Sequence, residues 1–192
     1  MLYPLPAILL TTRNKEGRDN VCTVAWAGTV CTNPPMLSVS LRPSRLSCEY
    51  LSETGVFGVN LTTEALAEAT DFCGVRSGRD VDKFEFCHFH KEEAAEIPCA
   101  LIAESPVSIE CRVKETLPLG SHTMFVAEVL AVHADTKYLG ENGAFDLDLA
   151  DPIVYSHGVY RGLGKKLGTF GYSVKKAKRK KTTGKNKKIT EK

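Results

Sequence analysis

The chain has 192 residues and a formal net charge of +2, which is the size of one ordinary domain that can bury a core without disulfide bonds or structural metals. This charge is unevenly placed, because twelve Lys or Arg and one Glu stand from Lys165 onward, whereas residues 1–164 hold thirteen basic and twenty-two acidic side chains. Seven cysteines, none in a C-x-x-C pair, favour reduced thiols in a cytoplasmic protein, and prolines at positions 4 and 6 argue against a signal peptide or a membrane span.

The first predicted elements are β-strands. Ile8 to Thr12 has the composition of a strand, and the charged residues 14–20 predict an exposed turn that makes a hairpin with the next strand. That next strand, Val21 to Ala25, and a later one, Met36 to Leu41, are rich in β-branched and apolar residues. The prolines within residues 33–35 lack the amide hydrogen that a β-ladder needs, so this segment must turn or run extended. We therefore predict a strand, a bend and a strand.

The segment R-P-S-R at 42–45 follows these strands and precedes a helix. Apolar residues at helical spacing predict that helix from about Arg45 to Glu53, with Ser44 as its N-cap. Two guanidinium groups beside a helix N-terminus form a ready site for a phosphate. The alternative is an ordinary solvated start of a helix.

The middle of the chain contains a strand, a helix and a long irregular segment. Gly55 predicts the end of the first helix, and Val56 to Leu61 reads as a buried strand. The threonines at 62 and 63 are candidate caps of a second helix that ends at Gly74. Residues 75–104 show no clean helical or strand period, so we expect a long excursion from the main β-structure. Loops of this length are usually functional.

The last third of the chain predicts more β-structure. Residues 107–113 alternate between apolar and polar side chains, as in a half-buried strand, and residues 117–120 turn the chain. Thr123 to His133 is apolar on both faces near its start, which predicts a central strand. An acidic loop at 143–151 precedes a short strand, Ile153 to Tyr155.

About six short strands, two modest helices and no βαβ alternation predict a mainly β fold, an antiparallel barrel. We assign residues 1–174 to this domain, of which 160–172 form a glycine-punctuated end. Residues 175–192 are almost wholly Lys, Thr, Gly and Asn, with only Ile189 to bury, so we expect a disordered basic tail.

Several motifs together resemble one known family. N-x-x-x-x-A-W begins at Asn20, V-C-T-N-P-P at Val30 and R-P-S-R at Arg42. Three further stretches follow in the family's order: G-V-F-G-V-N-L at 55–61, S-G-R-D-V-D-K-F at 77–84 and L-G-S-H-T-M-F-V-A-E-V at 119–129. From about residue 5 to about residue 172 the chain resembles the flavin reductase-like family of FMN-binding split barrels, which includes flavoredoxins and ferric reductases of anaerobes.

The resemblance implies a fold, a cofactor and an activity. The fold would be an FMN-binding split barrel, which is an antiparallel Greek-key barrel with flanking helices, and two subunits of a homodimer would share the site. Electrons would pass from NAD(P)H through FMN to flavin, ferric iron or another acceptor. The alternative is a flavoredoxin-like carrier that receives electrons from a protein donor and has no small-molecule substrate of its own.

The resemblance also implies that FMN lies against the first strand pair, with its phosphate near the serine and arginines of R-P-S-R and with the 77–84 segment folded over it. From the residues alone, each part has an ordinary structural alternative. The strands could be a pair that packs a tryptophan, Asn60 could be a turn residue at a strand end, and the 77–84 segment could be a plain charged loop. The residues that the resemblance assigns to FMN are Thr23, Val24, Ala25, Trp26, Thr29, Val30, Cys31, Thr32, Leu41, Arg42, Ser44, Arg45, Asn60, Leu61, Ser77, Arg79, Asp80, Lys83, Phe84 and Tyr172.

His122 is the catalytic candidate. A lone histidine is usually a surface or satisfied core residue, but the family commonly has G-D-H at this place, with the histidine close to the flavin and the nicotinamide. Here Ser121 replaces the aspartate. The carboxylate that would raise the imidazole pKa is therefore missing from the adjacent position, which leaves the orientation and charge of His122 open.

Two other features are less specific indications of a binding site. Cys87, His88 and His90 are metal-ligand types, but neighbours this close do not form a structural zinc site by themselves, so we predict no metal. The Lys-rich tail has no interleaved aromatic residues, so we expect at most weak, non-specific contact with nucleic acid or an anionic surface. A third possible function is a binding or anchoring protein in which this tail matters more than the barrel.

Overall fold

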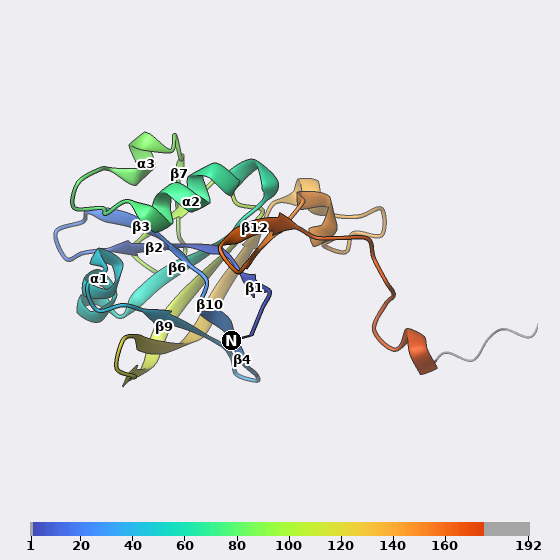
Figure 1. The fold of residues 1–192 in the computed structure, drawn as a ribbon, viewed down its shortest axis with the longest axis horizontal. Coiled ribbons are helices and arrows are strands. Elements are labelled where there is room, and N and C mark those ends of the chain that lie inside the picture. The colour runs from blue at the N-terminus through green and yellow to red at the C-terminus, as the bar shows by residue number, and fades with distance from the viewer. Residues whose placement is uncertain (1, 175–192) are drawn as a thin grey trace, which may run out of the picture.

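A computed structural model describes residues 2–174 of the chain (Figure 1). The predicted tail, 175–192, lies outside the described residues. The three α-helices of the described part are α1 (Leu46–Thr54), α2 (Ala67–Val75) and α3 (Lys83–Phe86). Its strands are β1 (Leu5–Pro6), β2 (Ile8–Arg13), β3 (Asp19–Val24), β4 (Ala27–Thr32), β5 (Pro35–Leu41), β6 (Val56–Leu61), β7 (Lys91–Glu93), β8 (Ala100–Ile102), β9 (Val107–Pro118), β10 (Thr123–Ala134), β11 (Ile153–Ser156) and β12 (Val159–Gly162).

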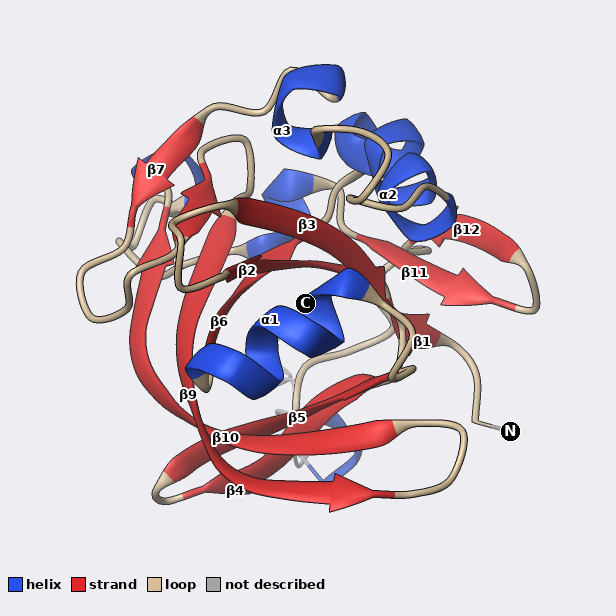
Figure 2. Cartoon of the chain, turned by 90° about the vertical axis from the view of Figure 1, so that its left-hand side faces the viewer, coloured by secondary structure: helices blue, strands red, loops and turns tan. Residues whose placement is uncertain are grey.

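Seven strands form one antiparallel sheet in the order β3-β2-β6-β9-β10-β5-β4. The sheet curls into an open barrel, and α1 lies across its opening (Figure 2). This confirms the predicted mainly β antiparallel barrel with flanking helices, the β2–β3 hairpin and the central place of β10. A smaller sheet, β1-β11-β12, stands beside the barrel, and β7 pairs with β8. No helix within residues 2–174 is long and apolar enough to cross a membrane.

The structure contains more strands than the sequence indicated. A third strand, β4, occupies most of the expected bend between β3 and β5. The chain bends at 25–26 before β4 and turns at 33–34 after it, and this turn lies within the 33–35 segment that was predicted to turn or run extended. The Ala, Gly and Thr residues of β4 lack an apolar alternation because β4 is an exposed edge strand. Likewise β12 extends into the start of the glycine-punctuated segment 160–172, where no strand was predicted.

Two of the predicted helix caps, Ser44 and Thr62, are wrong. The N-cap of α1 is Arg45, not Ser44, and no side chain caps this helix. Thr62 donates its hydroxyl to the carbonyl oxygen of Ala7 at 2.6 Å, so a tertiary hydrogen bond takes the group that a cap would use. Thr63 does hold the N-cap position of the short 3₁₀ turn Glu64–Leu66 that leads into α2, although its side chain makes no capping hydrogen bond. The helix α2 ends at Val75, one residue beyond the predicted Gly74. The Gly55 stop is confirmed, because Gly55 has φ 70° and its N–H donates to the Leu51 carbonyl oxygen.

The barrel strand β2 is buried on both faces. Leu9 and Leu10 are both 0% exposed, and they belong to different hydrophobic clusters. The inner cluster consists of Ile8, Leu10, Val24, Val39, Leu41, Cys48, Leu51, Phe57, Val59, Cys111, Phe125 and Ala127. The outer cluster consists of Leu9, Val21, Leu66, Cys73, Phe84, Phe89, Ala100 and Ile102.

The outer cluster corrects our view of residues 75–104. Instead of a loose excursion, this segment contains α3, β7 and β8 and packs on the outside of β2 and β3. A buried carboxylate fixes its central turn: Glu110 of β9 is 0% exposed. Its oxygens accept from the backbone N–H of Ala95 at 2.7 Å, Glu96 at 2.6 Å and Ile97 at 3.0 Å. His133 Nε2 lies 2.5 Å from the same carboxylate.

Gly58 permits the close contact between β6, β2 and β8. A Cβ at this position would lie 2.7 Å from Cδ2 of Leu101 and closer still to Oγ1 of Thr11. We therefore expect Gly58→Ala to lower the free energy of unfolding by about 1–3 kcal/mol, because a close-packed core does not absorb an added methyl freely. Denaturant titration measures this change. Gly164→Ala is the control, since a Cβ there meets nothing within 4 Å; equal losses in both variants would contradict the prediction.

Candidate functional site

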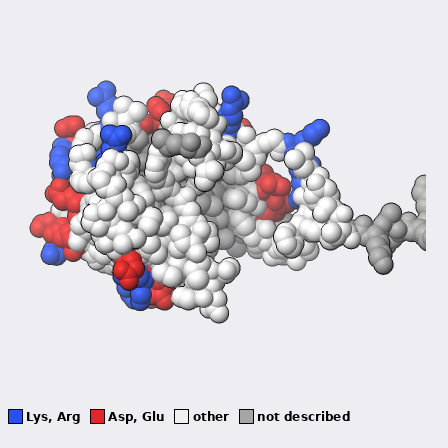
Figure 3. Space-filling model, turned by 60° about the horizontal axis from the view of Figure 1, so that its bottom comes forward, with Lys and Arg blue, Asp and Glu red and all other residues white. Residues whose placement is uncertain are grey.

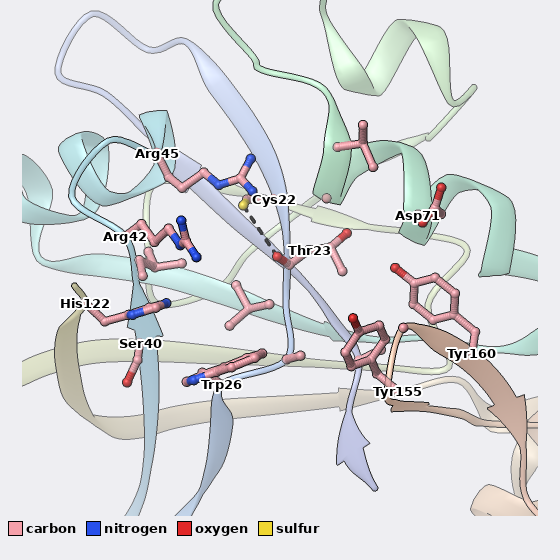
Figure 4. A pocket seen from close by; sticks show the side chains of 17 residues that line it. Cys22, Thr23, Trp26, Ser40, Arg42, Arg45, Asp71, His122, Tyr155 and Tyr160 are labelled. Carbon is pink, nitrogen blue, oxygen red and sulfur yellow. Dashed lines mark hydrogen bonds between the residues drawn. The ribbon is translucent and has the colours of Figure 1, made fainter. Parts of the chain in front are cut away.

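A cavity of about 550 Å³ opens where β3 ends, and its volume falls within the range of about 300–1,000 Å³ that is usual for small-molecule sites. Its walls come from segments that are far apart in the sequence: the bend after β3, the end of β5, the start of α1, the end of α2, the β9–β10 turn and the β11–β12 hairpin (Figure 4). It is lined by Ala7, Cys22, Thr23, Val24, Ala25, Trp26, Ser40, Leu41, Arg42, Arg45, Asp71, Gly74, Val75, His122, Tyr155, Gly158 and Tyr160.

One end of the cavity is cationic. Arg42 and Arg45 approach it from the loop before α1 (Figure 4), and both also line an adjoining cavity of about 220 Å³. The second cavity is lined by Asn20, Cys22, Arg42, Ser44, Arg45, Leu46, Ser47, Arg76, Ser77, Gly78 and Lys83, with no acidic side chain among them. Four cations and several hydroxyl groups therefore surround this space, although residues 1–164 are acidic in sum.

Lys83 is the buried cation of the second cavity. It is only 4% exposed, and its Nζ donates to the carbonyl oxygens of Val21 at 2.7 Å and Cys73 at 2.8 Å. Burial lowers its pKa, and the nearby guanidinium of Arg45 acts in the same direction. Because an ammonium group has three donors, one more remains for an anion in this cavity.

An aromatic pair borders the first cavity. The rings of Trp26 and His122 are parallel within 4°, with their centroids 5.9 Å apart. Trp26 is 39% exposed, so part of this large ring faces solvent. The hydroxyl of Ser121 lies 2.9 Å from His122 Nδ1, so serine takes the position of the family's aspartate and still engages the imidazole. Nε2 is then the ring nitrogen left for a ligand.

The far end of the cavity is aromatic and acidic. The rings of Tyr155 and Tyr160 lie 5.5 Å apart, and Asp71 of α2 faces them (Figure 4). Burial, together with the nearby Asp71 carboxylate, raises the pKa of Tyr160 to about 12. Tyr160 is therefore a neutral phenol at physiological pH, and the two ends of the cavity differ in charge.

The structure brings together about half of the predicted site residues. Thr23, Val24, Ala25, Trp26, Leu41, Arg42, Arg45 and His122 line the first cavity, and Ser44, Ser77 and Lys83 line the second. Asn60 is fully buried, with its side chain bonded to the carbonyl of Leu9, the N–H of Ile102 and the hydroxyl of Ser108. Phe84 belongs to the outer cluster.

The remaining predicted residues lie elsewhere in the single chain. Arg79 pairs with Glu49 at 2.5 Å on the surface, and neither Asp80 nor the half-buried Leu61 lines either cavity. Tyr172 is 61% exposed, in a segment that extends away from the barrel (Figure 1). Thr29, Val30, Cys31 and Thr32 belong to the edge strand β4 and do not line the cavities either.

Several lining residues were not found by sequence reasoning. Asp71, Tyr155 and Tyr160 stand in no recognisable motif, and only the fold places them together. Cys22 occupies one of the variable positions of N-x-x-x-x-A-W, so the motif itself did not single it out. Arg76 had a signal, since it immediately precedes the S-G-R-D stretch. Among the described residues, no group of three or more His, Cys, Asp or Glu side chains is placed to hold a metal ion.

Comparison with known proteins gives consistent matches. Residues 1–164 match the family profile described as "Flavin reductase like domain". Flavoredoxin of Desulfovibrio vulgaris (Miyazaki F) superposes with a TM-score of 0.85 at 27% identity, over 91% of this chain and 95% of that one. Flavoredoxin from Methanosarcina acetivorans gives 0.82 at 32% identity, over the same shares.

Curated proteins also match. The NADH-dependent flavin reductase StyB of Pseudomonas fluorescens is 26% identical over 130 residues, which are 68% of this chain and 72% of that protein. Three further archaeal and bacterial relatives are matched over 58% to 84% of their own length. The likeness thus covers most of the barrel and includes the segments that line the cavity.

Proposed function

Because the chain belongs to the flavin reductase-like family, we propose that it is an FMN-binding redox protein that takes electrons from NAD(P)H and passes them to flavin, ferric iron or another acceptor. The observation that carries the proposal is the polarity of the cavity, which has Arg42 and Arg45 at one end and the open Trp26–His122 pair beside it. FMN has a matching polarity, since a flat ring and a phosphate stand at its two ends.

The residues present fit this cofactor. Arg42 and Arg45 would hold the phosphate through charge-assisted hydrogen bonds, with Lys83 and the hydroxyls of Ser44 and Ser77 in the adjoining cavity. The ring would lie along the 23–26 segment, which lines the cavity. When bound, FMN supplies the ring that accepts and gives up electrons; the chain anchors it, orients it and limits the access of water.

His122 is the proposed catalytic residue. The Ser121 hydroxyl engages Nδ1, so Nε2 is the atom that can hold a proton for a substrate or accept one from it. The parallel ring of Trp26 keeps the imidazole plane fixed beside the cavity. The donor would enter on this side, because the half-exposed Trp26 marks where the cavity meets solvent.

A second candidate function is electron carriage without a small-molecule substrate. The likeness to two flavoredoxins favours it, as both superpose over nearly the whole barrel. In this case a protein would be the electron donor, and the aromatic pair would shield the flavin edge instead of receiving nicotinamide. The two functions differ in one observable, which is whether NADH or NADPH reduces the bound flavin.

We expect the purified protein to be yellow and to lose its visible flavin absorbance within seconds when it is mixed anaerobically with NADH or NADPH. His122→Ala should slow this bleaching and leave FMN bound, because the imidazole acts on the donor and not on the phosphate. Rapid-mixing spectroscopy measures the rate. His90→Ala is the matched control, since that exposed histidine pairs with Glu104 and neither residue lines a cavity.

Other outcomes identify the alternatives. Bleaching by reduced ferredoxin but by neither nicotinamide would favour the carrier. A colourless protein that gains no flavin absorbance on titration with FMN would refute the central proposal.

We also propose a cytoplasmic homodimer that shares its sites. All seven cysteines are free, as expected in a reducing compartment. Much of the middle of the face in Figure 3 is uncharged, and the edge strand β4 leaves Val30 52% exposed. The predicted cofactor residues of β4 and Tyr172 do not line the cavity of their own chain, so they would act at the partner's site.

Contact of the 175–192 tail with nucleic acid stays a prediction of weak, non-specific binding.

A further inference from the structure

Two cysteines on the outer side of the barrel lie side by side. The Sγ atoms of Cys73 and Cys87 are 3.8 Å apart. Cys73 belongs to α2 and is 0% exposed, whereas Cys87 is the C-cap residue of α3 and is half-buried. All seven cysteines lie in the described part of the chain. Among them, Cys73 and Cys87 are the one pair whose sulphur atoms lie within hydrogen-bonding distance of each other.

The surrounding contacts hold the two sulphur atoms near each other. The rings of Phe72 and Phe86, the residues that immediately precede the two cysteines, stack with centroids 3.9 Å apart and planes within 4°. From within α3, Lys83 donates to the carbonyl oxygen of Cys73 at 2.8 Å. Thus two contacts beside the cysteine pair join α2 to α3 and hold the two helices close together.

We propose that Cys73 and Cys87 are a disulfide-forming site, oxidised by a low-molecular-mass disulfide of the oxidised glutathione class. A protein disulfide has an S–S distance of about 2.05 Å, so the two sulphur atoms must approach by roughly 1.8 Å. Cys87 ends a helix of four residues and can move more easily than Cys73, which is packed in the outer cluster.

The exposure of the two thiols sets the order of the steps. Cys87 loses its proton, and its thiolate attacks one sulphur of the small disulfide, which releases one thiolate and leaves a mixed disulfide on Cys87. Cys73 then loses its proton and attacks Cys87 Sγ, which forms the protein disulfide and releases the second small thiolate. The protein gives up two electrons and two protons, and the small disulfide becomes two thiols.

The environment of the pair determines the rate. Burial raises the pKa of both thiols, so few thiolates form at neutral pH, while the Lys83 ammonium favours the thiolate form of each. Oxidation should therefore be slow at neutral pH and faster at mildly alkaline pH. Formation of the disulfide would also affect the lining of both cavities. Gly74 and Val75, next to Cys73, line the first cavity, and Lys83 lines the second.

The test is incubation of the folded protein with oxidised glutathione at mildly alkaline pH, followed by intact-mass measurement and peptide mapping without reduction. We expect a mass lower by two hydrogen atoms, a bridge that maps to Cys73 and Cys87, and recovery of the original mass with dithiothreitol. An unchanged mass, a stable glutathione adduct on Cys87 or a bridge between other cysteines would overturn the proposal.

Single variants test the order of the steps. Cys73→Ser should trap the mixed disulfide as a glutathione adduct on Cys87, whereas Cys87→Ser should give neither an adduct on Cys73 nor a bridge. Cys31→Ser, which alters a half-buried thiol on β4, is the control and should form the bridge as the unaltered chain does. Thermal unfolding of each variant shows that it is folded, and a bridge lost equally in the control would contradict the assignment.

Discussion

Replacing both Arg42 and Arg45 by alanine is expected to weaken FMN binding by about two to four orders of magnitude. Each charge-assisted hydrogen bond contributes about 1.5–3 kcal/mol, and about 1.4 kcal/mol is a factor of ten in affinity. The two guanidinium groups line both cavities, so their loss removes the phosphate anchor from each side. Flavin fluorescence titration measures the dissociation constant.

Riboflavin is FMN without the phosphate, so its binding shows whether a loss of affinity comes from the phosphate anchor or from the ring site. The double variant should bind riboflavin as the unaltered chain does, so only the advantage of FMN over riboflavin should vanish. Arg112→Ala is the matched control, since this exposed arginine of β9 lines neither cavity. An unchanged FMN affinity in the double variant would place the phosphate elsewhere, and an equal loss for both flavins would indicate damage to the ring site.

Replacing Glu110 by glutamine is expected to lower the free energy of unfolding by about 2–4 kcal/mol at neutral pH. The carboxylate is completely buried and accepts from three backbone N–H groups and from His133. A glutamine would turn an NH₂ group toward some of these donors and leave them unpaired. Denaturant unfolding measures the loss, and Glu115→Gln on the exposed part of β9 is the control.

The effect of Glu110 should also depend on pH in a defined direction. Burial raises the pKa of this carboxyl, but the hydrogen bonds from Ala95 and His133 outweigh burial, and the folded-state pKa lies below its ordinary value. Its contribution is therefore complete above the unfolded-state pKa and is lost as the pH falls through the folded-state pKa. The stability gap between the two proteins should narrow in acid, and a gap that widens there would contradict the assignment.

The parts of the site that the sequence predicted are those with local signals. R-P-S-R stands at a strand-to-helix junction, so Arg42 and Arg45 could be placed before the fold was known. His122 stands at a strand turn with a family motif. In contrast, Asp71 and Tyr160 meet only because α2 packs beside the β11–β12 hairpin, and no local pattern encodes that contact.

Similar limits apply to the fold. The apolar strands β2, β6 and β10 have clear patterns and were predicted, whereas the edge strand β4 is formed by small and polar residues whose pairing with β5 depends on the sheet. Asn60 shows the same limit at the site. Its motif suggested a place near the flavin, but its amide is used inside the core to join β2, β8 and β9.

The strand β2 belongs to both hydrophobic clusters, and this has a consequence for cooperativity. Leu10 packs in the inner cluster, and the adjacent Leu9 packs in the outer cluster with residues of the 75–104 segment. The two clusters are therefore joined through one strand. If the outer cluster opened, one face of β2 would be exposed to water, and the strand that supports the inner cluster would lose its packing. The two cores should therefore melt together as one cooperative unit. Lys83 and Ser77 would then reach their places only when the whole domain is folded.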